Sequence, residues 1–118
     1  MKHIVVLACT LVGIGLASAE VADRYKPLKG EYSIYAGELG DQGAPTAKDR
    51  KISFIVTGAV ARDMFESMGP DDKNACITAG ERSRSKQNVW CAFSRKEGYT
   101  CYFGFDLRSG KSIPGGIC

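Results

Sequence analysis

The densest cluster of charged side chains is the run Glu81-Arg82-Ser83-Arg84-Ser85-Lys86. Its three cations can bind phosphate, an acidic glycan or a carboxylate-lined cleft, because guanidinium groups pair well with oxyanions. Trp90 follows shortly afterwards, and Tyr102 is expected beside it on a neighbouring strand. The candidate partner-binding residues are therefore Arg82, Arg84, Lys86, Trp90 and Tyr102. The alternatives are that the charges form a solvated turn and that the aromatic pair covers the second face of a sheet.

Carboxylates offer a second kind of chemistry. A small hydrolase could use Glu81 or Asp106 beside an arginine. The adjacent pair Asp71-Asp72 is instead expected to bend and cap a turn. Asp41 and Asp49 flank a loop that contains glycine and proline, but they lack the regular alternation of a calcium-binding loop. The sequence therefore predicts no metal site and no cofactor.

Residues 1–19 are organised as a secretory signal peptide. Lys2 and His3 form a polar start, residues 4–16 are an almost unbroken apolar run, and Ala17-Ser18-Ala19 offers small residues to a signal peptidase. The apolar run is too short to span a bilayer. We therefore expect a single mature domain over residues 20–118 in the periplasm, or alternatively secreted, with no membrane span after signal removal.

The composition excludes several catalytic mechanisms. His3 is the only histidine of the chain, and it lies within the predicted signal. The mature domain therefore lacks Ser–His–Asp and Cys–His catalysis, together with most catalytic zinc sites. Nucleic-acid binding is not expected either, because the domain is exported and its formal charge is nearly balanced. These exclusions predict a protein that is not an enzyme.

The cysteines that remain after signal removal predict two disulfides, because an even number in an exported chain is typical of bridged domains. They are Cys76, Cys91, Cys101 and Cys118. The favoured connectivity is Cys76–Cys91 with Cys101–Cys118, since each bridge would close a neighbouring hairpin. The second is Cys76–Cys118 with Cys91–Cys101, since Cys91 and Cys101 project to the same face of adjacent strands.

Alternating apolar residues predict a series of short strands. The expected strands are Tyr32–Ala36, Ile52–Val56, Ala75–Ala79, Val89–Phe93 and Tyr99–Leu107. Residues 37–48 are expected to form a long loop and residues 80–88 a polar turn. Pro114 limits the last stretch to an edge position.

The period changes after Thr57-Gly58. Val60, Met64 and Met68 are four residues apart, which predicts an amphipathic helix of about ten residues that Gly69-Pro70 ends. The fold class that follows is α+β: an antiparallel sheet of four to six strands, with one amphipathic helix packed on it and two disulfides.

In size, compartment, cysteine usage and lack of catalytic residues, the chain resembles the small, exported, disulfide-stabilised bacterial proteins of the inhibitor and immunity type. Such proteins block an enzyme by inserting a loop. The resemblance implies a non-enzymatic inhibitor or immunity partner of a cell-envelope-active enzyme. It includes no family-specific motif, so it assigns no residues. The alternatives are an anion- or glycan-binding envelope module and the small carboxylate-dependent hydrolase.

Overall fold

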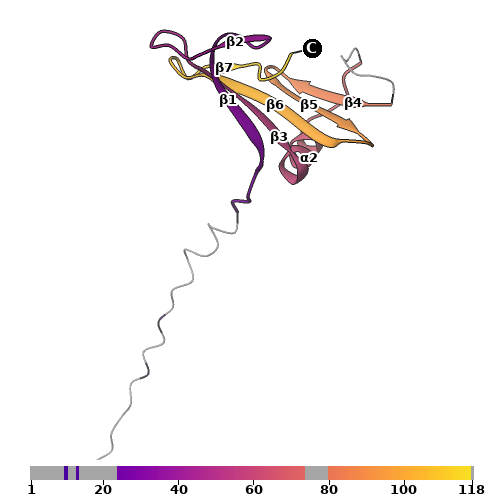
Figure 1. Ribbon diagram of the computed structural model, residues 1–118. Helices are drawn as coiled ribbons and strands as arrows, with labels where there is room; N and C mark the ends of the chain where they lie inside the picture. Colours follow the sequence, from indigo (N-terminus) through magenta and orange to yellow (C-terminus); the bar gives the residue numbers. More distant parts are fainter. Residues whose placement is uncertain (1–9, 11–12, 14–23, 74–79, 118) are drawn as a thin grey trace, which may run out of the picture.

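The computed structural model describes residues 24–73 and 80–117, together with Thr10 and Gly13. An antiparallel sheet with one helix on one face makes up this part of the chain, which confirms the α+β class (Figure 1). The elements are β1 (Lys29–Glu38), β2 (Asp41–Gly43), β3 (Lys51–Thr57), α2 (Gly58–Ser67), β4 (Arg82–Lys86), β5 (Val89–Ser94), β6 (Gly98–Asp106) and β7 (Ser112–Ile113). The strand order is β2-β1-β3-β6-β5-β4, and β7 pairs with β6.

Within residues 24–73 and 80–117 the sheet has seven strands, one more than the upper limit expected. Part of the expected long loop is the short strand β2, which pairs with the end of β1. The expected polar turn over residues 80–88 is largely strand β4, which pairs with β5 along its whole length. These two predictions were wrong because charged and small residues can occupy an edge strand, where one face is solvated. The predicted strand over residues 75–79 lies outside the described residues.

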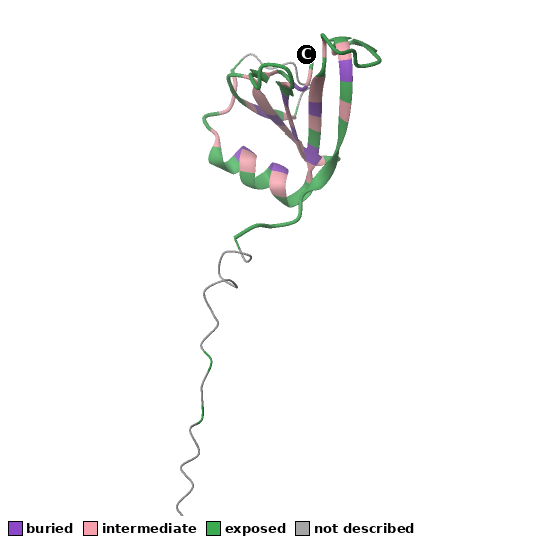
Figure 2. Ribbon diagram, turned by 90° about the vertical axis from the view of Figure 1, so that its left-hand side faces the viewer, coloured by how far each residue is buried: buried purple, intermediate pink, exposed green. Residues whose placement is uncertain are grey.

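Helix α2 follows β3 directly and packs on the sheet as its periodicity predicts. Ala61 and Phe65 are buried against Val56 of β3, and Val60 and Met64 pack around them. These buried positions lie on the side of the helix that faces the sheet (Figure 2). We call this face of the sheet the helix-bearing face and the opposite one the helix-free face.

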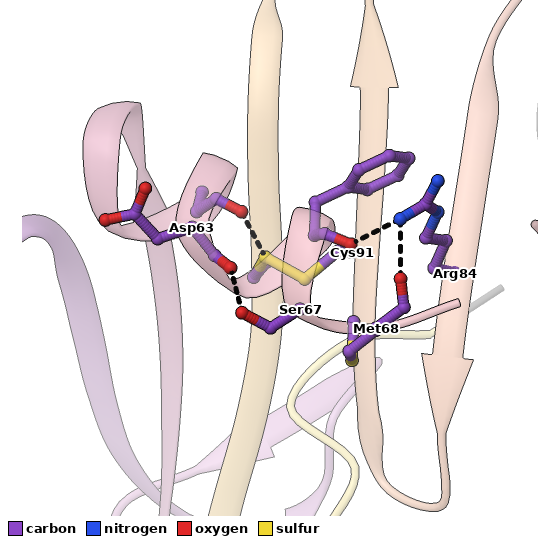
Figure 3. Close-up of a disulfide and its surroundings, with 8 residues drawn as sticks. Asp63, Ser67, Met68, Arg84 and Cys91 are labelled. Carbon is purple, nitrogen blue, oxygen red and sulfur yellow. Dashed lines mark hydrogen bonds between the residues drawn. A yellow bond between two sulfur atoms is a disulfide. The ribbon is translucent and has the colours of Figure 1, made fainter. Parts of the chain in front are cut away.

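A disulfide between Cys91 and Cys101 lies at the centre of this core (Figure 3). The two residues are direct cross-strand neighbours on β5 and β6, and both are fully buried. Cys101 Sγ lies 3.4 Å from the carbonyl oxygen of Ala61 in the helix. The favoured connectivity was therefore wrong: the strand register places Cys91 opposite Cys101, so neither is available to Cys76 or Cys118. Those two cysteines lie outside the described residues.

The hairpin formed by β1 and β2 is fastened to the start of β3 by Asp49. One oxygen of its carboxylate accepts a hydrogen bond from the amide of Gly37 at 2.9 Å, and the other lies 2.6 Å from Lys51 Nζ. Lys51 Nζ also donates to the carbonyl oxygen of Gly37 at 3.0 Å. The lysine holds the pKa of Asp49 below its ordinary value. Asp49 is thus a structural anchor for the hairpin.

Candidate functional site

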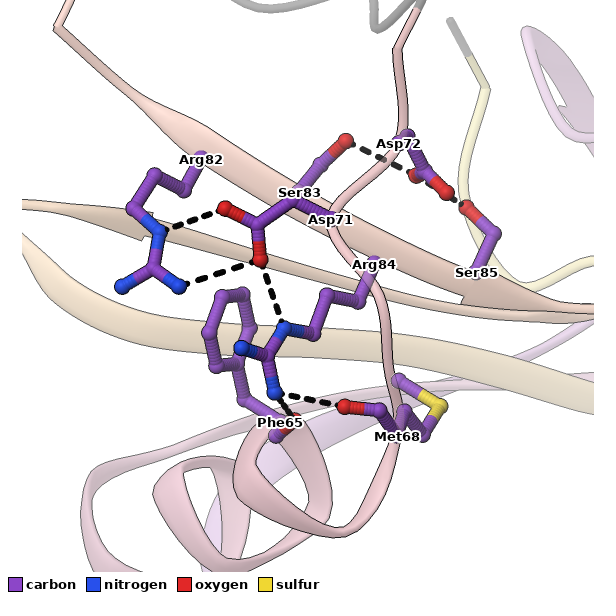
Figure 4. A network of polar contacts seen from close by, with 8 residues as sticks. All are labelled: Phe65, Met68, Asp71, Asp72, Arg82, Ser83, Arg84 and Ser85. Atoms are coloured by element: carbon purple, nitrogen blue, oxygen red, sulfur yellow. Dashed lines mark hydrogen bonds and ion pairs between the residues drawn. The ribbon is translucent and has the colours of Figure 1, made fainter.

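Arg82 and Arg84, two of the predicted partner-binding residues, form an ion-pair cluster with Asp71 (Figure 4). Arg82 binds the carboxylate in a bidentate manner, with Nε and Nη2 at 2.7 and 3.0 Å from its two oxygens. Arg84 Nε lies 2.7 Å from one of the same oxygens. The two guanidinium groups that a partner was expected to bind therefore share one carboxylate, which neutralises one of their two positive charges.

Arg84 also caps the helix. Its Nη1 donates to the carbonyl oxygens of Phe65 and Met68 at 2.8 and 2.5 Å, which are carbonyls at the C-terminal end of α2 (Figure 4). Its guanidinium lies 4.3 Å from the centre of the Phe65 ring. Only 19% of its side chain is exposed. Arg84 therefore joins strand β4 to the helix and presents little surface to a partner.

Asp72 fastens the same segment to β4 by a second set of contacts. Its Oδ2 accepts hydrogen bonds from Ser83 Oγ and Ser85 Oγ at 2.9 and 2.7 Å, and its amide donates to the carbonyl oxygen of Ser83 at 2.8 Å. Asp71 and Asp72 thus hold the residues after the helix against β4. Of the predicted basic residues, Arg82 and Lys86 are exposed and Arg84 is half-buried.

The two arginines lower the pKa of Asp71 to about 2, from an ordinary value of 3.8, through hydrogen bonds to the charged carboxylate. Because the folded-state pKa lies below the unfolded one, this stabilisation is present above about pH 4 and is lost as the pH falls towards 2. We expect the urea midpoint of Asp71→Asn to fall less over this range than that of the wild type. If the urea midpoints of the two proteins fell equally as the pH is lowered, this role of Asp71 would be contradicted. Asp49 is common to both proteins, so the comparison isolates Asp71.

Trp90 and Tyr102 lie side by side on the helix-free face, as the alternation of their strands predicts. They are direct register neighbours on β5 and β6, and their rings are stacked with centroids 4.7 Å apart. Burial raises the pKa of the Tyr102 hydroxyl, and the charge of Glu97 raises it further, so the phenol is neutral and can donate a hydrogen bond at physiological pH.

This aromatic pair borders a cavity of about 360 Å³ on the helix-free face, which we call the aromatic cavity. Ser53 and Ile55 of β3 also line it, and Glu31 and Ser33 come from β1. The β1–β2 hairpin adds Leu39 and Gln42, and residues 115–117 supply a further wall. The volume lies within the range of small-ligand sites in proteins.

The wall over residues 115–117 depends on two glycines. Ser53 Oγ, which is buried, donates to the carbonyl oxygen of Gly115 at 2.7 Å and fixes this segment against β3. A Cβ atom at Gly115 would lie 2.1 Å from the carbonyl oxygen of Phe103, and one at Gly116 would lie 2.8 Å from Cγ of Tyr102. Only residues without a side chain let the segment approach β6 so closely.

The polar groups of the aromatic cavity are suited to binding. Ser33 Oγ donates to Gln42 Oε1 at 2.6 Å, which leaves the amide nitrogen of Gln42 as a donor. Glu31 supplies a carboxylate, and the lining residues include no lysine or arginine. The cavity can therefore hold a polar ligand with hydroxyl or amide groups, and it offers no cation to an anionic one.

The residues proposed for hydrolysis do not line the aromatic cavity. Asp106 Oδ1 accepts hydrogen bonds from the amides of Arg108 and Ser109 at 2.8 and 3.3 Å, so it caps a turn. Glu81 and Glu97 line two other hollows, one of about 120 Å³ that Trp90 and Tyr102 also border, and one of about 450 Å³ that Arg95 and Lys96 also line. Within residues 24–73 and 80–117 there is no group of three or more side chains that could hold a metal ion.

No family model, curated protein or solved structure matches this chain. In the described ranges no helix has the length and apolar character needed to cross a membrane.

Sequence reasoning found the aromatic pair but missed the rest of the cavity. Ser53 was visible as a single polar residue within the apolar run of β3, and Gly115-Gly116 as a glycine pair close to the last cysteine. Neither signal says that the two segments meet, because they are separated by 62 positions in the chain.

Proposed function

We propose that this chain is a non-enzymatic binding protein of the cell envelope, and that the aromatic cavity binds a glycan. The observation that carries the proposal is a cavity of ligand size in which a stacked Trp90–Tyr102 pair lies beside hydroxyl, amide and carboxylate groups. Sugars present both apolar C–H surfaces and hydroxyl groups, and such a lining satisfies both.

The electrostatics favour a neutral or amino-bearing glycan over an anion. The lining contains the carboxylate of Glu31 and no cation. Arg82 and Arg84 lie on the helix-bearing face of β4, because they pair in register with Phe93 and Cys91. Asp71 compensates one of their two positive charges. The basic residues of β4 therefore lie on the face opposite the aromatic cavity, which favours a ligand of that cavity without negative charge.

Export is part of the same proposal. The signal-like residues 1–19 favour the periplasm, or alternatively secretion. The Cys91–Cys101 disulfide supports an oxidising compartment, where such bonds form and persist.

An inhibitor or immunity partner of an envelope enzyme remains the second candidate. The observation that favours it is the β1–β2 hairpin, whose base is held by the Asp49 contacts to Gly37 and Lys51. A hairpin whose base is held before binding loses less conformational entropy on entering a cleft than a free loop does.

Trp90 provides a direct test, because it is the only tryptophan of the chain and it borders the aromatic cavity. The probes are maltohexaose, oligomers of N-acetylglucosamine and a muramidase digest of peptidoglycan, each titrated while the Trp90 emission is recorded. We expect a saturable change with at least one glycan. The affinity of the protein for that glycan should vary little with salt concentration if the glycan is neutral.

Two isoleucine variants form a matched pair for this experiment. Ile55 lines the aromatic cavity and is 37% exposed, whereas Ile34 lies on the helix-bearing face and is 39% exposed. Ile55→Lys should abolish the titration, and Ile34→Lys should leave it unchanged. If no glycan gives a saturable change up to millimolar concentrations, or if both variants behave alike, the glycan proposal is wrong. An affinity-tagged form of the protein would then be incubated with an envelope extract, and retention of a single enzyme would support the inhibitor candidate.

A further inference from the structure

Strand β1 has an open outer edge. Lys29 to Tyr35 pair with β3 on one side, whereas β2 pairs only with Ala36 to Glu38 on the other (Figure 1). In the described part of the chain, no strand pairs with the outer side of Lys29 to Tyr35. The backbone groups along that edge can therefore pair with another strand.

The opposite edge of the sheet is different. The outer side of β4 already receives a backbone hydrogen bond, from the amide of Asp72 to the carbonyl oxygen of Ser83. The serine hydroxyls of that strand also bind Asp72. The edge of β1 is thus the better place for an added strand.

The side chains along the β1 edge are complementary to themselves. Lys29 and Glu31 are two positions apart and point to the same face of the sheet. When two copies of this strand run antiparallel about Gly30, each Lys29 lies opposite Glu31 of the second copy. The same register places Leu28 opposite Tyr32. Leu28 and Tyr32 are 66% and 69% exposed in the single chain, so the pairing would remove apolar surface from water.

We propose that the outer edge of β1 pairs with the same edge of a second copy of this chain, forming a twofold dimer with a continuous sheet. Main-chain hydrogen bonds supply the attachment, and the two Lys29–Glu31 pairs and two Leu28–Tyr32 pairs set the register. A twofold contact uses the same patch on both copies, which is why a self-complementary edge is the relevant feature. The inference is independent of the glycan proposal.

Charge exchange tests the register. The wild type, Lys29→Glu, Glu31→Lys and the double variant would be compared by sedimentation equilibrium from low micromolar to several hundred micromolar concentrations. We expect the wild type to dimerise and each single variant to dimerise about tenfold more weakly or worse, because two attractive pairs become repulsive. The double variant should regain the wild-type association.

A mixture of the two single variants provides a further arm. In a heterodimer, each glutamate of the Lys29→Glu copy faces a lysine of the Glu31→Lys copy, so the mixture should associate more tightly than either component alone. A wild type that stays monomeric throughout overturns the proposal, as does association that is unaffected by the single reversals. Both residues are exposed, and circular dichroism would verify that each variant is folded. Glu31 also lines the aromatic cavity, so these variants are judged by association alone.

Discussion

Replacing Cys91 and Cys101 together by alanine is expected to lower the free energy of unfolding by about 3 kcal/mol. The bond closes a loop across a sequence separation of 10, so its loss restores conformational freedom to the unfolded chain. Both residues are also fully buried between the sheet and α2, where the sulfur atoms fill the core. Urea unfolding followed by far-ultraviolet circular dichroism would measure the change.

Reduction of the native wild type is the control. Because neither cysteine is exposed, a thiol reductant should leave this bond intact until the protein unfolds. Trypsin cleaves after Arg95 and Lys96, which lie between the two cysteines. The peptides that contain Cys91 and Cys101 should therefore stay linked by the disulfide after cleavage and separate only when it is reduced. If the free energy of unfolding of the double variant were lower than that of the wild type by less than about 1 kcal/mol, the bond would add little to the packing around it.

Replacing Arg84 by methionine is expected to cost about 2 kcal/mol of stability. The change removes two charge-assisted hydrogen bonds to the last helical carbonyls and one ion pair with Asp71. Methionine keeps a similar apolar stem, so the loss reports the contacts of the guanidinium group, including its contact with the Phe65 ring.

Lys86→Met is the matched control, because Lys86 lies two positions along the same strand and is exposed. Its substitution should change the urea midpoint little. Equal losses in the two variants would indicate a general intolerance of β4 to apolar residues, and would refute the proposed cap. A loss confined to Arg84→Met would establish that the predicted contact residue is structural.

The periodic elements were predictable because their pattern is local. The helix was expected near Val60 to Met68 and occupies Gly58–Ser67. The alternation in Tyr99, Cys101 and Phe103 placed these residues on one face of β6, and the register confirms that face. In both cases one face of the element is buried, and burial fixes the period.

The basic strand and the disulfide were not predictable from local pattern. Arg82 and Arg84 alternate with serines, so no apolar period marks β4, and their partner Asp71 lies in a different element. The pairing of Cys91 with Cys101 depends on the register of β5 against β6, which spacing alone does not determine. The aromatic pair was found because each residue belongs to a well-patterned strand.

The walls of the aromatic cavity differ in how firmly they are held. Its floor belongs to β3 and β6, and β6 is paired with β3 along one side and with β5 and β7 along the other. Leu39 and Gln42 instead belong to a hairpin with three register pairs, and every residue of β2 is exposed. Such a segment opens at a free energy well below that of global unfolding. A guest larger than the resting volume can therefore enter by displacing Leu39 and Gln42 towards the tip of the hairpin, while Asp49 holds its base at Gly37 and the floor on β3 and β6 stays in place.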